Sequence, residues 1–359
     1  MKRSKNAALI LAMMVVAVAA TVTADPQFTL VASGLANPRG LTFGPGGRLY
    51  VAQAGVGDHT GKISEIQDPT SAHPTVRDVV TGLLSIPGEN PGEFVGVDGI
   101  SALGNGNIAA IIGESELGGE AAPAGHLFHF NPAGQLRDLA NVGNYNYAWS
   151  VAHQYLAPHD FTPGDSNPYG VLAVPGGVYV ADAGTNTLNF VKANGDISIL
   201  AYFPNNIIAD ATPTCIAKGP DGALYVGTLA LVDSIVMGAR ATVYRVDPAQ
   251  TNPDDLNTIV SVAQPWVKGL WPITGCAVGP DGSFYASQFF THFNPQAQGI
   301  PFEKGDVVKI DLASGTKTSL TNGALDLPGG VAVGPDGAVY VTNHSAFLPS
   351  GEVVRLTNK

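Results

Sequence analysis

The sequence predicts an all-β protein, a six-bladed β-propeller with four antiparallel strands in each blade. Three observations support this fold: a hairpin phrase recurs along the chain, most copies precede a second pair of strands, and the two chain ends complement each other. Repeats of four strands with a period of this size are typical of propeller blades.

The recurring phrase is a tight turn between two apolar runs. Its clearest copies are KGPDGALYVGTL (218–229), VGPDGSFYASQF (278–289) and VGPDGAVYVTNHS (333–345). Proline presets φ for the first central position of the turn, aspartate suits the next, and glycine accepts the positive φ that follows. The flanking runs, such as 331–333 and 339–341, are almost continuously apolar. We therefore expect hairpins that are covered on both faces by their neighbours.

The number of copies predicts six blades. Weaker copies are FGPGGRLYVAQAG (43–55), ALGNGNIAAIIGE (102–114) and AVPGGVYVADAG (173–184). Successive turns lie between 45 and 71 residues apart, and their quartets begin at Gly44, Leu103, Val174, Gly219, Gly279 and Gly334. Helical solenoids also repeat on this scale, but no repeat here has a helical period of apolar residues.

The two ends of the chain predict how the ring closes. The last repeat ends after its third strand, GEVVRLTNK (351–359), and the strand FTLVASGL (28–35) has no hairpin partner of its own. We expect 28–35 to pair with 351–356 as the outer strand of the sixth blade. This pairing would remove the exposed sheet edges that invite aggregation.

Residues 1–24 have the pattern of a secretory signal peptide. They begin with Lys2, Arg3 and Lys5, continue with an apolar stretch over 7–20, and end in small residues before Asp25. An uncleaved membrane anchor is the alternative, but the apolar stretch is short and the cleavage site is good. We expect a secreted or periplasmic protein without a stable membrane anchor, in which 25–359 form a single propeller domain.

The charge balance restricts the partners. The chain has 18 Lys and Arg against 29 Asp and Glu, a net charge of -11, and no basic run. Nucleic acid and anionic lipid are therefore poor partners. We expect a monomer that binds a small molecule, a glycan or a protein.

The candidate binding site is a polar ring at one end of the central channel. The long connections 85–98, 141–167, 228–241 and 287–306 all belong to the face opposite the tight turns, where rigid scaffolds usually carry binding loops. The candidates lie in or just before the innermost strands and are Asn37, Arg39, Asp98, Asp165, Asn167, Tyr169, Thr212, Thr214, Trp271, Thr274 and Asp326. Such a ring suits a polar ligand or a hard cation such as calcium. Alternatively, these side chains only cap turns.

No catalytic residue is assigned from the sequence. His126 and His129 are three residues apart on an expected strand, so their side chains point to opposite faces of the sheet and are poorly placed to share a metal ion. The chain has no nucleophile elbow, phosphate loop or calcium loop. Glu114, Glu116 and Glu120 form an acidic cluster, which we expect to be a solvated loop.

Several of these motifs resemble a known family. PRGLTFGPGGRLYVAQAG (38–55), DSNPYGVLAVPGGVYVADAG (165–184), CIAKGPDGALYVGTL (215–229) and the closing GEVVRL (351–356) are similar to the ScyD/ScyE family of secreted proteins, over nearly all of 25–359. This resemblance implies an exported propeller with no established reaction. The GPDG hairpins themselves are shared by many propellers, including NHL-repeat proteins.

A more distant resemblance is to six-bladed gluconolactonases (the SMP-30 type) and strictosidine-synthase-like proteins, whose channels can hold calcium. The glutamate and paired asparagines of that site find no match here, and Asp182 and Asn343 are the nearest metal-ligand candidates. No other cofactor is implied, except by a third interpretation, a quinone-dependent sugar dehydrogenase. The leading hypothesis is a non-catalytic binding protein, and the alternative is a calcium-dependent lactonase or hydrolase that uses the same mouth.

The two cysteines, Cys215 and Cys276, are the only ones in the chain. Export implies an oxidising compartment, in which two cysteines often pair. Both are expected on innermost strands, in the neighbouring blades four and five, offset by one place so that they can face each other. A disulfide and two buried free thiols both remain open.

Overall fold

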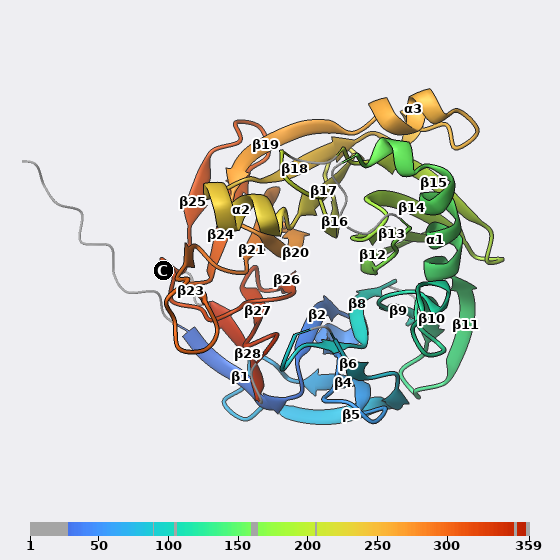
Figure 1. Cartoon of the computed structure of the whole chain (residues 1–359). Coiled ribbons are helices and arrows are strands. Elements are labelled where there is room, and N and C mark those ends of the chain that lie inside the picture. The colour runs from blue at the N-terminus through green and yellow to red at the C-terminus, as the bar shows by residue number, and fades with distance from the viewer. Residues whose placement is uncertain are drawn as a thin grey trace, which may run out of the picture.

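The computed structural model describes residues 28–88, 90–103, 106–158, 164–204, 207–347 and 350–356, so the expected signal peptide (1–24) lies outside the described residues. Six four-stranded antiparallel sheets form a ring around a central axis (Figure 1). The innermost strands of successive blades contact each other all the way round the ring. The predicted six-bladed propeller is confirmed.

The first three blades follow one another along the chain, each with its first strand at the axis and its last at the rim. Their strands are β2 (Pro38–Phe43), β3 (Leu49–Gln53), β4 (Gly61–Gln67) and β5 (Thr75–Leu83); β8 (Val97–Ala102), β9 (Ile108–Ile112), β10 (His126–Phe130) and β11 (Leu136–Asn141); and β12 (Pro168–Val174), β13 (Gly177–Asp182), β14 (Thr187–Lys192) and β15 (Ile197–Tyr202).

The other three blades have the same order, except that the last one takes its outer strand from the start of the chain. Their strands are β16 (Pro213–Lys218), β17 (Leu224–Thr228), β18 (Ala241–Val246) and β19 (Gln264–Leu270); β20 (Ile273–Val278), β21 (Ser283–Gln288), β24 (Asp306–Asp311) and β25 (Lys317–Ser319); and β26 (Val331–Val333), β27 (Val339–Asn343), β28 (Gly351–Leu356) and β1 (Phe28–Leu35).

Strand β1 closes the ring as the sequence predicts. It pairs antiparallel with β28, from Phe28 opposite Leu356 to Leu35 opposite Gly351, and Figure 1 shows the blue β1 beside the red β28. Val31, Ala32 and Leu35 are buried in a cluster between the last and first blades. The strand therefore contributes apolar packing as well as backbone hydrogen bonds.

The GPDG turns lie on the face of the ring opposite the long connections. Their last glycines, Gly222, Gly282 and Gly337, have φ angles of 81°, 73° and 77°, which a side chain would strain. Each turn aspartate accepts a hydrogen bond from a backbone N–H two residues later and pairs with a base on the third strand of its blade. These ion pairs are Asp221–Arg245 (2.8 Å), Asp281–Lys309 (2.7 Å) and Asp336–Arg355 (2.7 Å).

Glycines allow the innermost strands to approach each other closely. A Cβ placed on Gly99 would lie 2.3 Å from the Tyr169 carbonyl oxygen of the next blade, and one on Gly275 would lie 2.5 Å from the Gly329 carbonyl oxygen. Gly40, Gly170 and Gly330 make equivalent approaches. At the matching place in blade four the chain has Cys215 instead, and Cys215 forms a disulfide with Cys276 of blade five, with a Cα–Cα distance of 5.6 Å.

The long connections gather on the opposite face. They contain the small hairpin β6 (Ile86–Pro87) and β7 (Phe94–Val95), the hairpin β22 (His292–Phe293) and β23 (Phe302–Glu303), and the helices α1 (Val142–Ala152) and α2 (Leu231–Met237). Helix α3 (Leu256–Ser261) packs at the rim against β15. The 3-10 turns are η1 (Pro45–Gly47), η2 (Glu116–Gly118), η3 (Gln154–Leu156) and η4 (Pro248–Gln250). No helix in the described part of the chain is long and apolar enough to cross a bilayer.

Candidate functional site

A cavity of about 710 Å³ opens at the mouth of the channel, on the face of the long connections. Its walls come from the β6–β7 hairpin, the start of α2, the β22–β23 loop and the segment after β27. They are mainly apolar, and include Leu229, Leu231, Phe289, Ile300, Phe302 and Phe347. A cavity of this size and character is typical of small-molecule sites.

The floor of this cavity is polar. Six of the residues predicted from the sequence line it, and they are Arg39, Asn167, Tyr169, Thr212, Thr214 and Thr274. They come from the beginnings of innermost strands or from the residues just before them, which is the reason the sequence pattern indicated them. Thr214 and Thr274 donate their hydroxyl hydrogens to the carbonyls of Ile273 (2.6 Å) and Pro328 (2.7 Å).

Arg39 is the central charged group of the floor. Its side chain is 12% exposed, and its Nε atom lies 3.7 Å from Asp98 Oδ1, too far for a hydrogen bond. Nη2 donates a long hydrogen bond of 3.4 Å to the carbonyl of Phe94. Burial works to lower the pKa of Arg39, but Tyr169 and Asp98 raise it overall, so the guanidinium stays charged.

Asp98 is the acidic neighbour of Arg39 and lines the channel below the mouth. Burial raises its pKa to about 7, Glu93 adds to this shift, and Arg39 only partly opposes it. A loose ion pair at 3.7 Å does not offset the removal of the carboxylate from water. Asp98 Oδ2 and Asn167 Oδ1 converge over Gly113, where a Cβ would lie 2.5 Å and 2.8 Å from them.

Glu114 contradicts the expectation of a solvated acidic loop. Burial raises its pKa to about 8, and the nearby carboxylates of Asp165 and Asp98 raise it further. Its φ of 65° is unusual for a residue other than glycine. Glu116 is not free either, because it faces His126 at 3.4 Å and accepts a hydrogen bond from Asn144.

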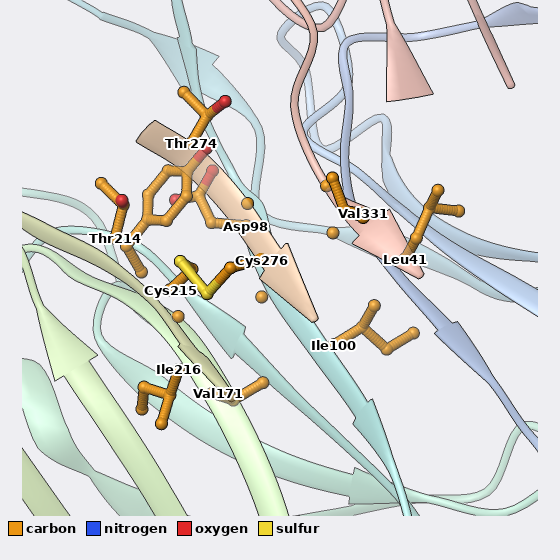
Figure 2. A pocket seen from close by; sticks show the side chains of 16 residues that line it. Leu41, Asp98, Ile100, Val171, Thr214, Cys215, Ile216, Thr274, Cys276 and Val331 are labelled. Carbon is orange, nitrogen blue, oxygen red and sulfur yellow. A yellow bond between two sulfur atoms is a disulfide. The ribbon is translucent and has the colours of Figure 1, made fainter. Parts of the chain in front are cut away.

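The channel below the mouth is narrow. Its cavity measures about 60 Å³ and is lined by the innermost strands of all six blades. Figure 2 shows Asp98, Thr214 and Thr274 toward one end, and Ile100, Val171 and Ile216 toward the other. The polar end joins the mouth cavity, since Thr214 and Thr274 line both.

The structure places four predicted residues away from both cavities. Asn37 is buried and donates its amide to the Gly55 carbonyl at 2.8 Å. Asp165 accepts a hydrogen bond from the backbone of Ser166. Trp271 packs against Phe290 with ring centroids 5.6 Å apart, and the Asp326 carboxylate is largely exposed, 3.6 Å from His344. Asn37 and Asp165 thus behave as turn-stabilising residues.

Comparisons with known proteins place this architecture among the propellers. No protein-family model and no curated protein sequence matches the chain. A candidate oxidoreductase (glucose dehydrogenase) from Thermus thermophilus is 15% identical with a TM-score of 0.56, over 92% of this chain and 100% of that one. The calcium-binding protein regucalcin from Agrobacterium tumefaciens is 14% identical with a TM-score of 0.53, over 93% and 96%. A streptogramin B lyase is 13% identical with a TM-score of 0.50, over 92% and 96%.

The likeness shows the fold. These three structures share the propeller architecture over most of this chain, and at such identities their activities do not transfer to it. The resemblance to the ScyD/ScyE family stays a prediction.

Asp182 and Asn343 are the metal-ligand candidates that the sequence suggested. Asp182 is 0% exposed, and its two oxygens accept five hydrogen bonds, from Asn146, Ser166, Asn167, Gly184 and Thr185.

Asn343 is similarly occupied. It accepts a hydrogen bond from the Asp326 backbone and donates one to Glu352. Asp182 and Asn343 belong to blades three and six, and both side chains are engaged by other protein groups. Within the described ranges, no group of three or more His, Cys, Asp and Glu side chains is arranged to hold a metal ion.

The structure instead makes Asp182 the residue that holds the DSNPYG loop in place. We expect Asp182→Asn to lower the free energy of unfolding by about 2 kcal/mol, because an amide NH2 would face the Asn146 and Ser166 donors. Urea denaturation measures this change. The control is Asp196→Asn in an exposed turn, which should change stability by less than about 0.5 kcal/mol. Equal effects of the two substitutions would contradict the structural role of Asp182.

Sequence reasoning missed the aromatic wall. Phe289, Phe290, Phe293, Phe302 and Phe347 form one cluster, with Phe290 and Phe302 stacked at 4.8 Å. Four of the chain's 14 Phe residues fall between 289 and 302, in or beside the long connection inside blade five. That concentration of aromatic residues in a binding-face connection was the available signal.

Proposed function

We propose that the protein is an exported, non-catalytic propeller of the ScyD/ScyE kind that binds a small molecule in the mouth cavity. The supporting observation is the cavity of about 710 Å³, with aromatic and aliphatic walls over a polar floor. Aromatic walls provide apolar contact area, and a few placed polar groups fix orientation. The apolar walls favour a small molecule over a glycan or a protein partner.

Export is part of the proposal. The pattern of residues 1–24 supports it, and the disulfide between Cys215 and Cys276 suits an oxidising compartment. The channel of about 60 Å³ below the mouth offers little further room, so the ligand would be held at the mouth.

The cavity can be tested with phenylnaphthylamine, a neutral apolar probe whose fluorescence rises when it leaves water. We expect saturable binding to the purified protein. Leu231→Trp, at the start of α2, should weaken this binding at least about tenfold by filling the cavity, which Leu231 lines. Val236→Trp is the matched control, because Val236 lies on the same helix but is 64% exposed and is not among the lining residues.

Two results would count against the proposal. Equal binding by the two tryptophan variants would place the probe outside the mouth. Hydrolysis of a lactone panel by the purified protein, lost on calcium chelation, would replace the binding role by that of a calcium-dependent lactonase. The raised pKa values of Asp98 and Glu114 make this assay worthwhile, since perturbed carboxyl groups cluster at functional sites.

A further inference from the structure

We infer that the mouth cavity selects an anionic amphipathic molecule, one that carries a carboxylate or sulfonate group on an aromatic or aliphatic body, with Arg39 as the residue that binds the anionic group. This inference rests on the proposed function, because it names the class of ligand for the same site. It depends on the charge, the free hydrogen-bonding capacity and the surroundings of Arg39.

The charges that line the cavity are few. Arg39 is the one cation among the described lining residues, and Glu93 is the one anion. Glu93 stands on the β6–β7 connection, where its carboxylate accepts hydrogen bonds from the backbone and side-chain nitrogens of Asn90. Glu93 interacts electrostatically with Arg39 but makes no ion pair with it within 4 Å among the described residues, so Arg39 is the only positive charge on the described lining that an anionic ligand can meet.

Arg39 has unused hydrogen-bonding capacity. A guanidinium has five N–H donors, and Arg39 gives one long bond to the Phe94 carbonyl and interacts with the Tyr169 hydroxyl. Its buried Nε atom has no hydrogen-bond partner among the described residues. Because this Nε atom is buried, the donors available to a ligand are those of the two Nη atoms, which carry four of the five hydrogens and suit the two oxygens of a carboxylate or sulfonate.

Asp98 competes with such a ligand for Arg39. The groups that face Asp98 are Arg39, Glu93, Tyr169 and Glu114. Burial raises the pKa of Tyr169, so its phenol stays neutral near pH 7. Burial also raises the pKa of Asp98 to about 7 and that of Glu114 to about 8. As the pH falls through this range, both carboxyl groups become neutral and Arg39 becomes available to an anion.

The walls define the rest of the ligand. Phe289, Phe302 and Phe347 stand together above the floor, with Phe302 6.4 Å from Phe347 and 5.8 Å from Phe289 between ring centroids. Aromatic and aliphatic groups pack well against such rings. A ligand whose anionic group binds Arg39 and whose apolar part packs against these rings would contact both the floor and the walls of the cavity.

A pair of matched probes tests the inference. Anilinonaphthalene sulfonate is phenylnaphthylamine with one added sulfonate, which stays ionised throughout the neutral pH range. We expect the wild-type protein to bind the sulfonate more tightly than the neutral probe. Arg39→Gln should weaken sulfonate binding by about 10- to 100-fold and neutral-probe binding much less, so that the ratio of the two affinities falls, because the charged hydrogen bonds act on the sulfonate alone.

The pH dependence provides a second readout. Sulfonate affinity should rise about tenfold from about pH 9 to about pH 6, while the affinity of the neutral probe stays constant. Asp98→Asn should bind the sulfonate more tightly than the wild type at about pH 9 and show a smaller change with pH, since Glu114 alone then titrates in this range. The double variant Arg39→Gln with Asp98→Asn removes the carboxylate that the single Arg39 change would leave unpaired, and it should lose sulfonate affinity to the same extent.

The outcomes separate this inference from the proposed function. If neither probe binds the wild-type protein, the proposed function fails and the inference fails with it. If both probes bind and Arg39→Gln leaves their affinity ratio unchanged, the binding function stands and the anionic ligand class is wrong. Thermal melting of each variant shows that it is folded. Leu231→Trp should weaken the binding of both probes to the same extent.

Discussion

Removing β1 is expected to open the ring and lower the stability of the whole protein. A chain that lacks residues 28–35 would expose the backbone of β28 along its outer edge. It would also expose the apolar surface that Val31, Ala32 and Leu35 cover. Burial of these side chains contributes on the order of 5 kcal/mol, so the melting temperature should fall by about 10 °C or more. Differential scanning calorimetry measures this change.

Point substitutions in the same strand provide the control. Leu30 is 54% exposed and Leu35 is buried, although both are leucines of β1. Leu30→Ser should change stability by less than about 0.5 kcal/mol, and Leu35→Ser should lower it by about 2 kcal/mol or more. A truncated protein that melts at the temperature of the intact one would show that β1 does not close the ring.

Loss of the disulfide is expected to have the next largest effect. The bridge joins residues 61 apart in sequence, and closing a loop of this length stabilises by about 4 kcal/mol in the chain-entropy model. The double variant Cys215→Ala with Cys276→Ala should therefore unfold at a lower guanidinium concentration than the wild type. In a reducing buffer, the guanidinium concentration at which the wild type unfolds should approach that of the variant. The unfolding of the variant itself should not change with reductant.

Thiol counting gives an independent measurement. Denatured but unreduced protein should show no reactive thiols, because the described chain has no free cysteine. Two reactive thiols per chain would mean that blades four and five are not cross-linked in the purified protein.

The sequence predicts the framework well because the framework depends on local patterns. The GPDG turns determine where the hairpins form, because their residues prefer the φ angles of a tight turn. The strand 28–35 and the three-stranded last repeat each lack a partner strand, so they are expected to pair with each other. The offset of Cys215 and Cys276 is also a local feature, since it follows from counting back from the turn glycines. In the structure this offset puts Cys215 where other blades have glycine.

The site is less predictable because its contacts come from segments far apart in sequence. Asp182 was a metal-ligand candidate because of its position in the repeat. In the structure its carboxylate is bound by Asn146 and Ser166, which come from the long connection before β12. Glu114 belongs to a run of acidic residues, yet burial beside Asp98 and Asp165 changes its titration. The position of a residue in the repeat predicts the direction of its side chain. The groups that this side chain contacts depend on the conformation of the connections, which the repeat does not predict.

The close approach of the six innermost strands makes the mouth cavity a dead end. Strands that nearly touch at their glycines leave a channel of about 60 Å³ below the floor, which is far too small for a molecule that fills the mouth. A ligand must therefore enter and leave through the same opening. Its residence time is then controlled by the β6–β7 and β22–β23 hairpins and α2. Substitutions in those segments can change the exchange rate of the ligand without altering the ring that carries them.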